Sequence, residues 1–208
     1  MQLVLVRHAL PERVHRDDGA ATGPANPPLT ELGRRQAGRL VRAVGHDVAG
    51  VYTSPQARAV ATAEPLASAL RRSPQVLDDL REYDADAAHY VPVHDMARLD
   101  PEGWQRMLDG LLPRYVDPTA FGARVAAVLE GIVAAHPGRA TAVVVAHAGV
   151  INVWLSRLLG IGRPLAFPLD YVGVTRVLAA RDGRRVVRTV NEIGHVADLL
   201  AMTAGSDT

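Results

Sequence analysis

The fold is decided by the stretch QLVLVRH at residues 2–8. Its first part, Gln2 to Val6, is a short run rich in valine and leucine, which predicts a buried β-strand. The run stops directly at Arg7 and His8. In sheets of parallel strands, ligands bind beyond the carboxyl ends of the strands. A guanidinium and an imidazole at such an end therefore indicate a functional site.

Two further junctions along the chain have the same form, in which an apolar strand runs into polar residues and then a helix. The strands are expected at 50–53 and 142–146, and the helices that follow them at about 56–70 and 150–159. These junctions carry Ser54, Arg58 and His147. Because parallel strands bring their carboxyl ends to one edge of a sheet, the sequence predicts a single polar cleft.

The remaining segments complete an alternating pattern. Residues 9–28 contain four prolines and two glycines without a periodic apolar pattern, which predicts a long surface loop. The other expected elements are a helix from Thr30 as N-cap to about Val44, a strand at 74–77, a helix from 119 or 120 to 135, and two strands near 172–180 and 185–192 joined at Asp182-Gly183.

Alternating strands and helices predict an α/β fold with three layers, α/β/α, around a mostly parallel central sheet with a mixed edge. A length of 208 residues suits one domain over 1–208. Residues 83–118 are acidic and interrupted by proline, with helical potential mainly at 102–112, and we interpret them as a small helical cap or insertion. His15 and His89 are candidates to line the entrance for a substrate.

Composition excludes several mechanisms. The chain has no cysteine and no lysine. A thiolate nucleophile, a cysteine zinc site, a Walker P-loop and a pyridoxal Schiff base are therefore impossible. A formal net charge of +1, with scattered arginines, predicts no nucleic-acid and no membrane partner. The first apolar run is too short for a signal peptide, so we expect a cytoplasmic protein.

The residues at the three junctions suit the handling of phosphate. A neutral imidazole is nucleophilic near pH 7, and two guanidiniums can neutralise the oxygens that carry charge during phosphoryl transfer. No metal and no cofactor are then required. The leaving oxygen needs a proton, which a carboxylic acid of raised pKa could supply. Glu82 and Asp84 are the candidates for this acid, and we favour Glu82.

Several motifs, in order along the chain, resemble those of the histidine phosphatase superfamily, the phosphoglycerate mutase-like proteins. They are Leu5-Val6-Arg7-His8, Pro28-Leu29-Thr30-Glu31-Leu32-Gly33, Thr53-Ser54-Pro55-Gln56-Ala57-Arg58, Leu80-Arg81-Glu82, Val145-Ala146-His147-Ala148-Gly149 and a last motif from Asn191 to His195. The resemblance covers nearly the whole chain.

The resemblance implies a role for each matching residue. His8 would take up the phosphoryl group, Arg7 and Arg58 would clamp it, His147 would stabilise its charge, and Glu82 would donate the proton. The substrate would be a small-molecule phosphomonoester, and no cofactor would be needed.

The chain departs from the family after each catalytic histidine, where Ala9 and Ala148 replace the usual glycine. An alanine that needs a positive φ is strained, so the floor of the pocket would differ there. The backbone amide of Ala148, at a helix start, is a further candidate donor to phosphate.

Three other functions are compatible with these residues. A mutase would return the phosphoryl group from His8 to another oxygen of a bound sugar acid. A binding module would hold a phosphorylated ligand without turnover. A metal-dependent hydrolase is disfavoured because no compact ligand motif such as H-E-x-x-H is present. An exposed apolar strand or helix could also form a homodimer.

Overall fold

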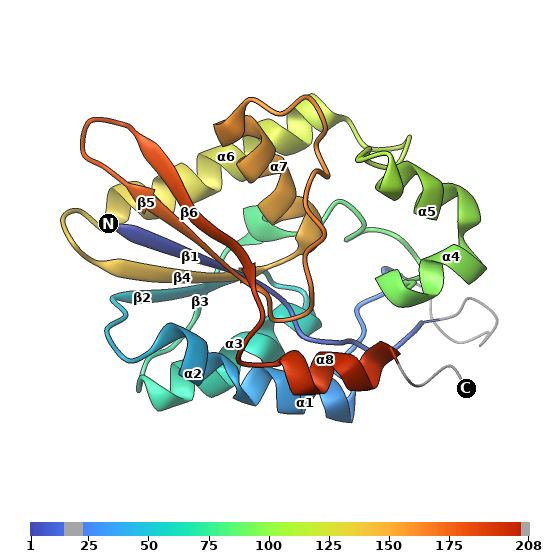
Figure 1. Ribbon diagram of the computed structural model, residues 1–208, viewed down its shortest axis with the longest axis horizontal. Coiled ribbons are helices and arrows are strands. Elements are labelled where there is room, and N and C mark those ends of the chain that lie inside the picture. The colour runs from blue at the N-terminus through green and yellow to red at the C-terminus, as the bar shows by residue number, and fades with distance from the viewer. Residues whose placement is uncertain (15–22, 205–208) are drawn as a thin grey trace.

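A six-stranded sheet forms the middle layer of the molecule (Figure 1). The computed structural model describes residues 1–14 and 23–204, so His15 lies outside the described residues. The strands are β1 (Gln2–Arg7), β2 (Gly50–Thr53), β3 (Gln75–Val76), β4 (Thr141–Ala146), β5 (Val174–Ala179) and β6 (Arg185–Glu192). They lie side by side in the order β3-β2-β4-β1-β5-β6.

The sheet is parallel on one side of β1 and antiparallel on the other. β1 pairs in parallel with β4, β4 with β2, and β2 with β3. β5 runs antiparallel to both β1 and β6. The closing hairpin turns at Asp182-Gly183, where Gly183 has a φ of 91°. The mostly parallel sheet with a mixed edge is thus confirmed.

Helices cover both faces of the sheet (Figure 1). They are α1 (Glu31–Gly38), α2 (Leu40–Val44), α3 (Ala57–Ala69), α4 (Met96–Leu99), α5 (Pro101–Leu108), α6 (Pro118–Ala135), α7 (Ala148–Leu159) and α8 (Ala197–Ala204), with short 3-10 helices η2 (Asp78–Leu80) and η3 (Val93–Asp95). Successive side chains of β1 point to opposite faces of the sheet. Leu3 and Leu5 pack towards α6 and α7, while Val4 and Val6 pack towards α1, α3 and α8. This burial of both faces explains the unbroken apolar runs in the central strands.

α6 is the longest helix in the described part of the chain, and by length and composition alone it could cross a membrane. One side of it is nevertheless buried in the core against the sheet and α7. The buried side chains recur at helical spacing and are Phe121, Val125, Leu129 and Ile132. This stripe is typical of a helix that covers a sheet.

The structure differs from the sequence prediction in three helical segments. The single helix expected from Thr30 to Val44 is divided at Arg39, directly after Gly38, one of two glycines in the segment. Thr30 is the N-cap of α1, as predicted, because its hydroxyl accepts from the amide of Gly33 at 2.9 Å. The prediction lacked both α4 and the last helix, α8, which packs beside α1.

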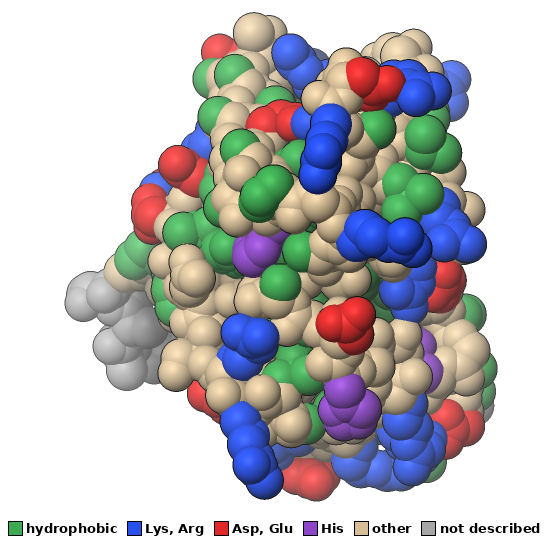
Figure 2. All heavy atoms as spheres, turned by 90° about the vertical axis from the view of Figure 1, so that its left-hand side faces the viewer, with side chains coloured by type: hydrophobic (Ala, Val, Ile, Leu, Met, Phe, Trp, Pro, Cys, Tyr) green, Lys and Arg blue, Asp and Glu red, His purple; other side chains and the backbone are tan. Residues whose placement is uncertain are grey.

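Figure 2 shows the face of the molecule on which the tip of the β5–β6 hairpin lies. Basic and acidic side chains are interspersed on this face, and the basic ones do not merge into one continuous tract. The mixture agrees with the near balance of 23 basic and 22 acidic residues in the sequence.

Candidate active site

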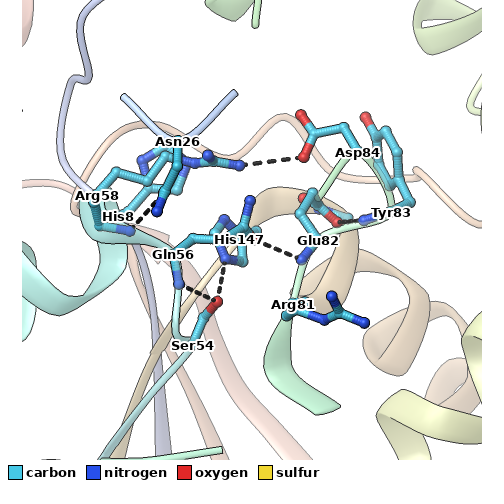
Figure 3. Close-up of polar contacts among 12 residues, drawn as sticks. His8, Asn26, Ser54, Gln56, Arg58, Arg81, Glu82, Tyr83, Asp84 and His147 are labelled. Carbon is cyan, nitrogen blue, oxygen red and sulfur yellow. Dashed lines mark hydrogen bonds and ion pairs between the residues drawn. The ribbon is translucent and has the colours of Figure 1, made fainter. Parts of the chain in front are cut away.

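The two histidines at the strand ends are brought together by the backbone of the sheet. Arg7 of β1 lies opposite Ala146 of β4, and the amide of His8 donates to the carbonyl oxygen of Ala146 at 2.9 Å. His8 and His147 are therefore the next residues of two paired parallel strands. Their ring centroids are 5.1 Å apart. Figure 3 shows His147 near the centre of the site, with His8 and Arg58 on one side of it and Glu82 on the other.

The contacts of His8 define its tautomer. Its Nδ1 lies 2.8 Å from the carbonyl oxygen of Ala9. A carbonyl oxygen only accepts, so Nδ1 carries the proton, and the lone pair of the neutral ring is on Nε2. Burial, followed by the charges of Arg58 and Arg7, holds the pKa of His8 well below its usual range. At neutral pH, His8 is a neutral imidazole with a nucleophilic Nε2.

His147 is oriented by Ser54. Its Nε2 lies 2.8 Å from the Ser54 hydroxyl, which also accepts from the amide of Gln56 at 3.3 Å. When this hydroxyl donates to Nε2, neutral His147 carries its proton on Nδ1, a buried atom without a hydrogen-bond partner in the described structure. Burial lowers the pKa of His147 well below its usual range, with Arg58 and then His8 adding to the effect. In this tautomer, His147 is a neutral donor whose Nδ1 proton is available to an anion.

Both predicted phosphate-binding arginines are buried, with exposed fractions of 6 % for Arg7 and 0 % for Arg58. Arg58 donates from Nη2 to Asp84 at 3.2 Å, and Arg7 donates from Nη1 to the carbonyl oxygen of Leu169. Within the described structure, Nε of Arg7 and both Nε and Nη1 of Arg58 have no partner. Buried donors without partners are costly. An anion bound between these side chains would satisfy them.

Glu82 lies in a buried position where two backbone amides hold its carboxyl group. Oε2 accepts from Gly149 at 2.8 Å and Oε1 from Tyr83 at 3.1 Å. Burial and the nearby charge of Asp84 nevertheless outweigh these bonds and raise the pKa of Glu82 to about 7. The structure therefore gives the two candidate acids different surroundings, because Asp84 is instead paired with Arg58.

The two alanines that replace glycine are accommodated without strain. Neither Ala9 nor Ala148 is among the residues with positive φ, so the strain considered from the sequence does not occur. Ala148 begins α7, where its amide has no partner within the helix. The position that lacks room for a side chain is the next residue, Gly149. A Cβ there would collide with Oε1 of Glu82 and would lie 2.6 Å from the ring of Tyr83.

A hollow of about 350 Å³ adjoins the acid. Glu82 and Tyr83 form part of its wall, together with Tyr115 and Phe121. Nothing in the sequence pattern pointed to Tyr115, which lies 33 residues beyond Glu82 along the chain (115 − 82). Among the described residues, no group of three or more His, Asp or Glu side chains is placed to hold a metal ion.

Sequence reasoning located the side chains at the strand ends but missed most of their supporting contacts. The side-chain oxygen of Gln56 accepts from the amide of Glu82 at 2.9 Å. The side chain of Asn26 caps the start of α3 by accepting from the amide of Ala57 at 2.7 Å. Both residues lie inside or beside recognised motifs, which is the signal that could have identified them.

Two neutral imidazoles, two buried arginines and a carboxyl of raised pKa at the carboxyl ends of parallel strands define a site suited to phosphoryl transfer to histidine. The family is then settled by sequence. The chain belongs to the histidine phosphatase superfamily (branch 1), whose family model matches residues 3–192.

Comparison with known proteins finds relatives both by sequence and by structure. The bifunctional protein Rv2228c of Mycobacterium tuberculosis is 32% identical over 204 residues, covering 94% of this chain and 55% of that protein, so this chain spans about half the length of that relative. A phosphoserine phosphatase variant from Entamoeba histolytica, solved with phosphoserine, matches with a TM-score of 0.73 and 20% identity, covering 94% of this chain and 98% of that one. A mycobacterial glucosyl-3-phosphoglycerate phosphatase matches with a TM-score of 0.71 and 20% identity, covering 91% and 98%. These two structures establish the shared fold.

Proposed function

We propose that the protein hydrolyses small-molecule phosphomonoesters through a phosphohistidine formed on His8. One observation carries the proposal: the Ala9 carbonyl fixes the His8 tautomer, which leaves Nε2 as a nucleophile beside arginine donors that have no partner. Membership of the histidine phosphatase superfamily supports the same chemistry, as do the phosphatase names of the structural relatives.

In the first half-reaction, Nε2 of His8 would attack phosphorus as the bond from phosphorus to the alcohol oxygen breaks. Arg7, Arg58 and Nδ1 of His147 would donate to the phosphoryl oxygens, with the amide of Ala148 as a further donor. Protonated Glu82 would give its proton to the leaving oxygen, so the alcohol departs neutral.

In the second half-reaction, the carboxylate of Glu82 would take a proton from water as the water oxygen attacks phosphorus. The bond from phosphorus to Nε2 breaks, and inorganic phosphate leaves with Glu82 protonated again. A pKa of about 7 suits a group that must act as an acid and then as a base near neutral pH.

The hollow beside Glu82 is a suitable place for the alcohol part of the substrate, because the group that protonates the leaving oxygen forms part of its wall. The two arginines that line this hollow already have partners within the protein. Arg81 pairs with Asp78 and Asp86, and Arg124 donates to backbone carbonyl oxygens. This arrangement favours hydrolysis of an ester with an uncharged alcohol over the mutase reaction, which must hold a highly charged sugar acid.

We further propose that residues 1–208 act as one domain, with the segment at about 83–118 as a cap that selects the alcohol. In the structure this segment contains η3, α4 and α5, and it supplies Tyr83 and Tyr115 to the hollow. Figure 1 shows α4 and α5 set to one side of the layered body.

The proposal is tested by incubating the wild type, His8→Ala and His46→Ala with p-nitrophenyl phosphate in the presence of EDTA. His46 is an exposed histidine after α2 and serves as the control. We expect turnover by the wild type and by His46→Ala, and none by His8→Ala. A base-quenched reaction with radiolabelled substrate should show label on the wild type and on His46→Ala, but not on His8→Ala.

Other outcomes separate the alternatives. Labelling of His8 without release of inorganic phosphate would support the mutase. Tight phosphate binding without labelling would support the binding module. Full activity of His8→Ala would disprove the mechanism.

A further inference from the structure

Each of the two buried arginines lies on the ring of a buried tyrosine. The guanidinium carbon of Arg7 is 4.0 Å from the ring centroid of Tyr171, and that of Arg58 is 4.5 Å from the ring centroid of Tyr90. The exposed fractions are 4 % for Tyr171 and 9 % for Tyr90. Neither tyrosine belongs to a motif recognised in the sequence, and the catalytic steps described above do not use them.

Stacking leaves the donors of an arginine available for an anion. A guanidinium is a flat group whose N–H bonds point outward in its plane, so a ring against its face does not compete with oxygens at its edges. The edge atoms without partners are Nε of Arg7 and Nε and Nη1 of Arg58. The rings also exclude water from the faces, which strengthens attraction between a cation and an aromatic ring.

The backbone beside Tyr171 is held in an unusual conformation. Val172, the next residue, has a φ of 57°, which is rare for a β-branched side chain. Strain of this kind persists only where surrounding contacts enforce it. Here the amide of Val172 donates to the carbonyl oxygen of Arg7 at 3.1 Å, and the amide of Arg7 donates to that of Gly173 at 3.3 Å.

Asn191, near the end of β6, supports the same turn. Its side-chain oxygen accepts from the amide of Asp170 at 2.8 Å, and its side-chain nitrogen donates to the carboxyl group of Asp170 at 2.7 Å. A Cβ on Gly173 would collide with that side-chain oxygen. Asn191, whose own φ is 57°, begins the last motif noted in the sequence, so this motif acts on the turn that places Tyr171.

Tyr90 is fixed independently. Its amide donates to the carbonyl oxygen of Val14 at 3.3 Å, and the amide of Val14 donates to that of Tyr90 at 3.4 Å. This isolated antiparallel bridge joins the cap to the loop after His8.

We propose that Tyr90 and Tyr171 are positioning residues that hold the guanidiniums of Arg58 and Arg7, respectively, by their faces, so that the free edges bind the phosphoryl group. The inference rests on the proposed phosphatase function. It assigns the tyrosines to binding of the phosphoryl group rather than to proton transfer, because only the aromatic face is needed.

The test compares phenylalanine and leucine at each position, using KM and kcat for p-nitrophenyl phosphate and the inhibition constant of inorganic phosphate. Leucine should raise KM and the phosphate inhibition constant about tenfold, while phenylalanine should stay within about threefold of the wild type. Tyr52→Leu is the control, since this buried ring meets His136 edge-on instead of an arginine. It should lower thermal stability and leave the phosphate inhibition constant unchanged.

A second measurement covers the case in which the leucine variants fail to fold. Phenylalanine analogues with increasing fluorination at position 90 keep nearly the same size while weakening the negative face of the ring. The phosphate inhibition constant should rise with each added fluorine. Equal constants across that series, or equal effects of leucine and phenylalanine, would overturn the inference. A wild type that neither turns over substrate nor binds phosphate would instead refute the proposed function.

Discussion

Replacing Glu82 by glutamine should separate substrates by the basicity of their leaving groups. The amide has nearly the shape of the acid but cannot donate an acidic proton. General acid catalysis contributes about 10²- to 10⁴-fold to rate, or about 3 to 5 kcal/mol of the barrier. An alkyl phosphate needs this proton, so its kcat/KM should fall by that factor. With p-nitrophenyl phosphate, whose leaving group is a weak base, we expect less than about a tenfold loss.

The pH dependence follows from the surroundings of the same carboxyl. Burial first, and then Asp84, raises the pKa of Glu82 to about 7. The acid form acts in the first half-reaction, so kcat/KM of the wild type on an alkyl phosphate should fall about tenfold per pH unit above about pH 7. With its ordinary pKa of 4.5, the group would be protonated in roughly one molecule in 300 at pH 7.

The same pKa has a consequence for stability. Because the folded protein binds this proton more tightly than the unfolded chain, the contribution of Glu82 to stability falls as pH rises from about 4.5 to about 7. Glu82→Gln should therefore gain stability relative to the wild type at pH values above that window, as measured by urea unfolding at both ends of it.

Steady-state release of inorganic phosphate, followed for the wild type, Glu82→Gln and Asp84→Asn across this pH range, provides the assay. Asp84→Asn is the matched control, because it removes the second candidate acid. The role of Glu82 would be refuted if Glu82→Gln slowed both substrates equally, or if Asp84→Asn alone abolished the decline at high pH.

Three further predictions concern other parts of the molecule. Gly149→Ala should cost about 1–3 kcal/mol of stability in thermal unfolding and also lower activity on alkyl phosphates, because the new Cβ collides with Glu82; wild-type behaviour would contradict the described packing. Arg58→Lys keeps a positive charge but loses the planar set of donors, so phosphate inhibition should weaken about 10- to 100-fold; an unchanged inhibition constant would show that charge alone suffices. Thr30→Ala removes the N-cap of α1 and should cost about 1 kcal/mol in urea unfolding with kcat unchanged; a loss of kcat would connect α1 to catalysis.

The strand-to-helix junctions could be predicted because both of their signals are local. The run before His8 and the run before His147 are continuous and apolar, since both faces of β1 and β4 are buried, and each ends abruptly at a polar residue. The parallel arrangement then follows from the intervening helices. The structure brings the side chains of Arg7, His8, Arg58 and His147 close together, and their catalytic roles stay predictions.

The supporting contacts could not be predicted because they join segments that are distant along the chain. The stacking of Arg7 on Tyr171 depends on a turn held by Asn191, and local preference disfavours the backbone of Val172 in that turn. The position of α8 beside α1 depends likewise on packing that hydrophobic periodicity does not contain.

The pairing of β1 with β4 also determines which parts of the protein can change independently. The hydrogen bonds of this pair set His8 and His147 at one level, and no residue of the cap takes part in them. Under the proposed function, a substitution in the wall of the hollow, such as one at Tyr115, would change the fit of the alcohol without shifting one histidine relative to the other. The strand pairing that holds the two histidines and the wall of the hollow thus belong to different parts of the chain, so under the proposed function the choice of alcohol could change while the two histidines keep their arrangement.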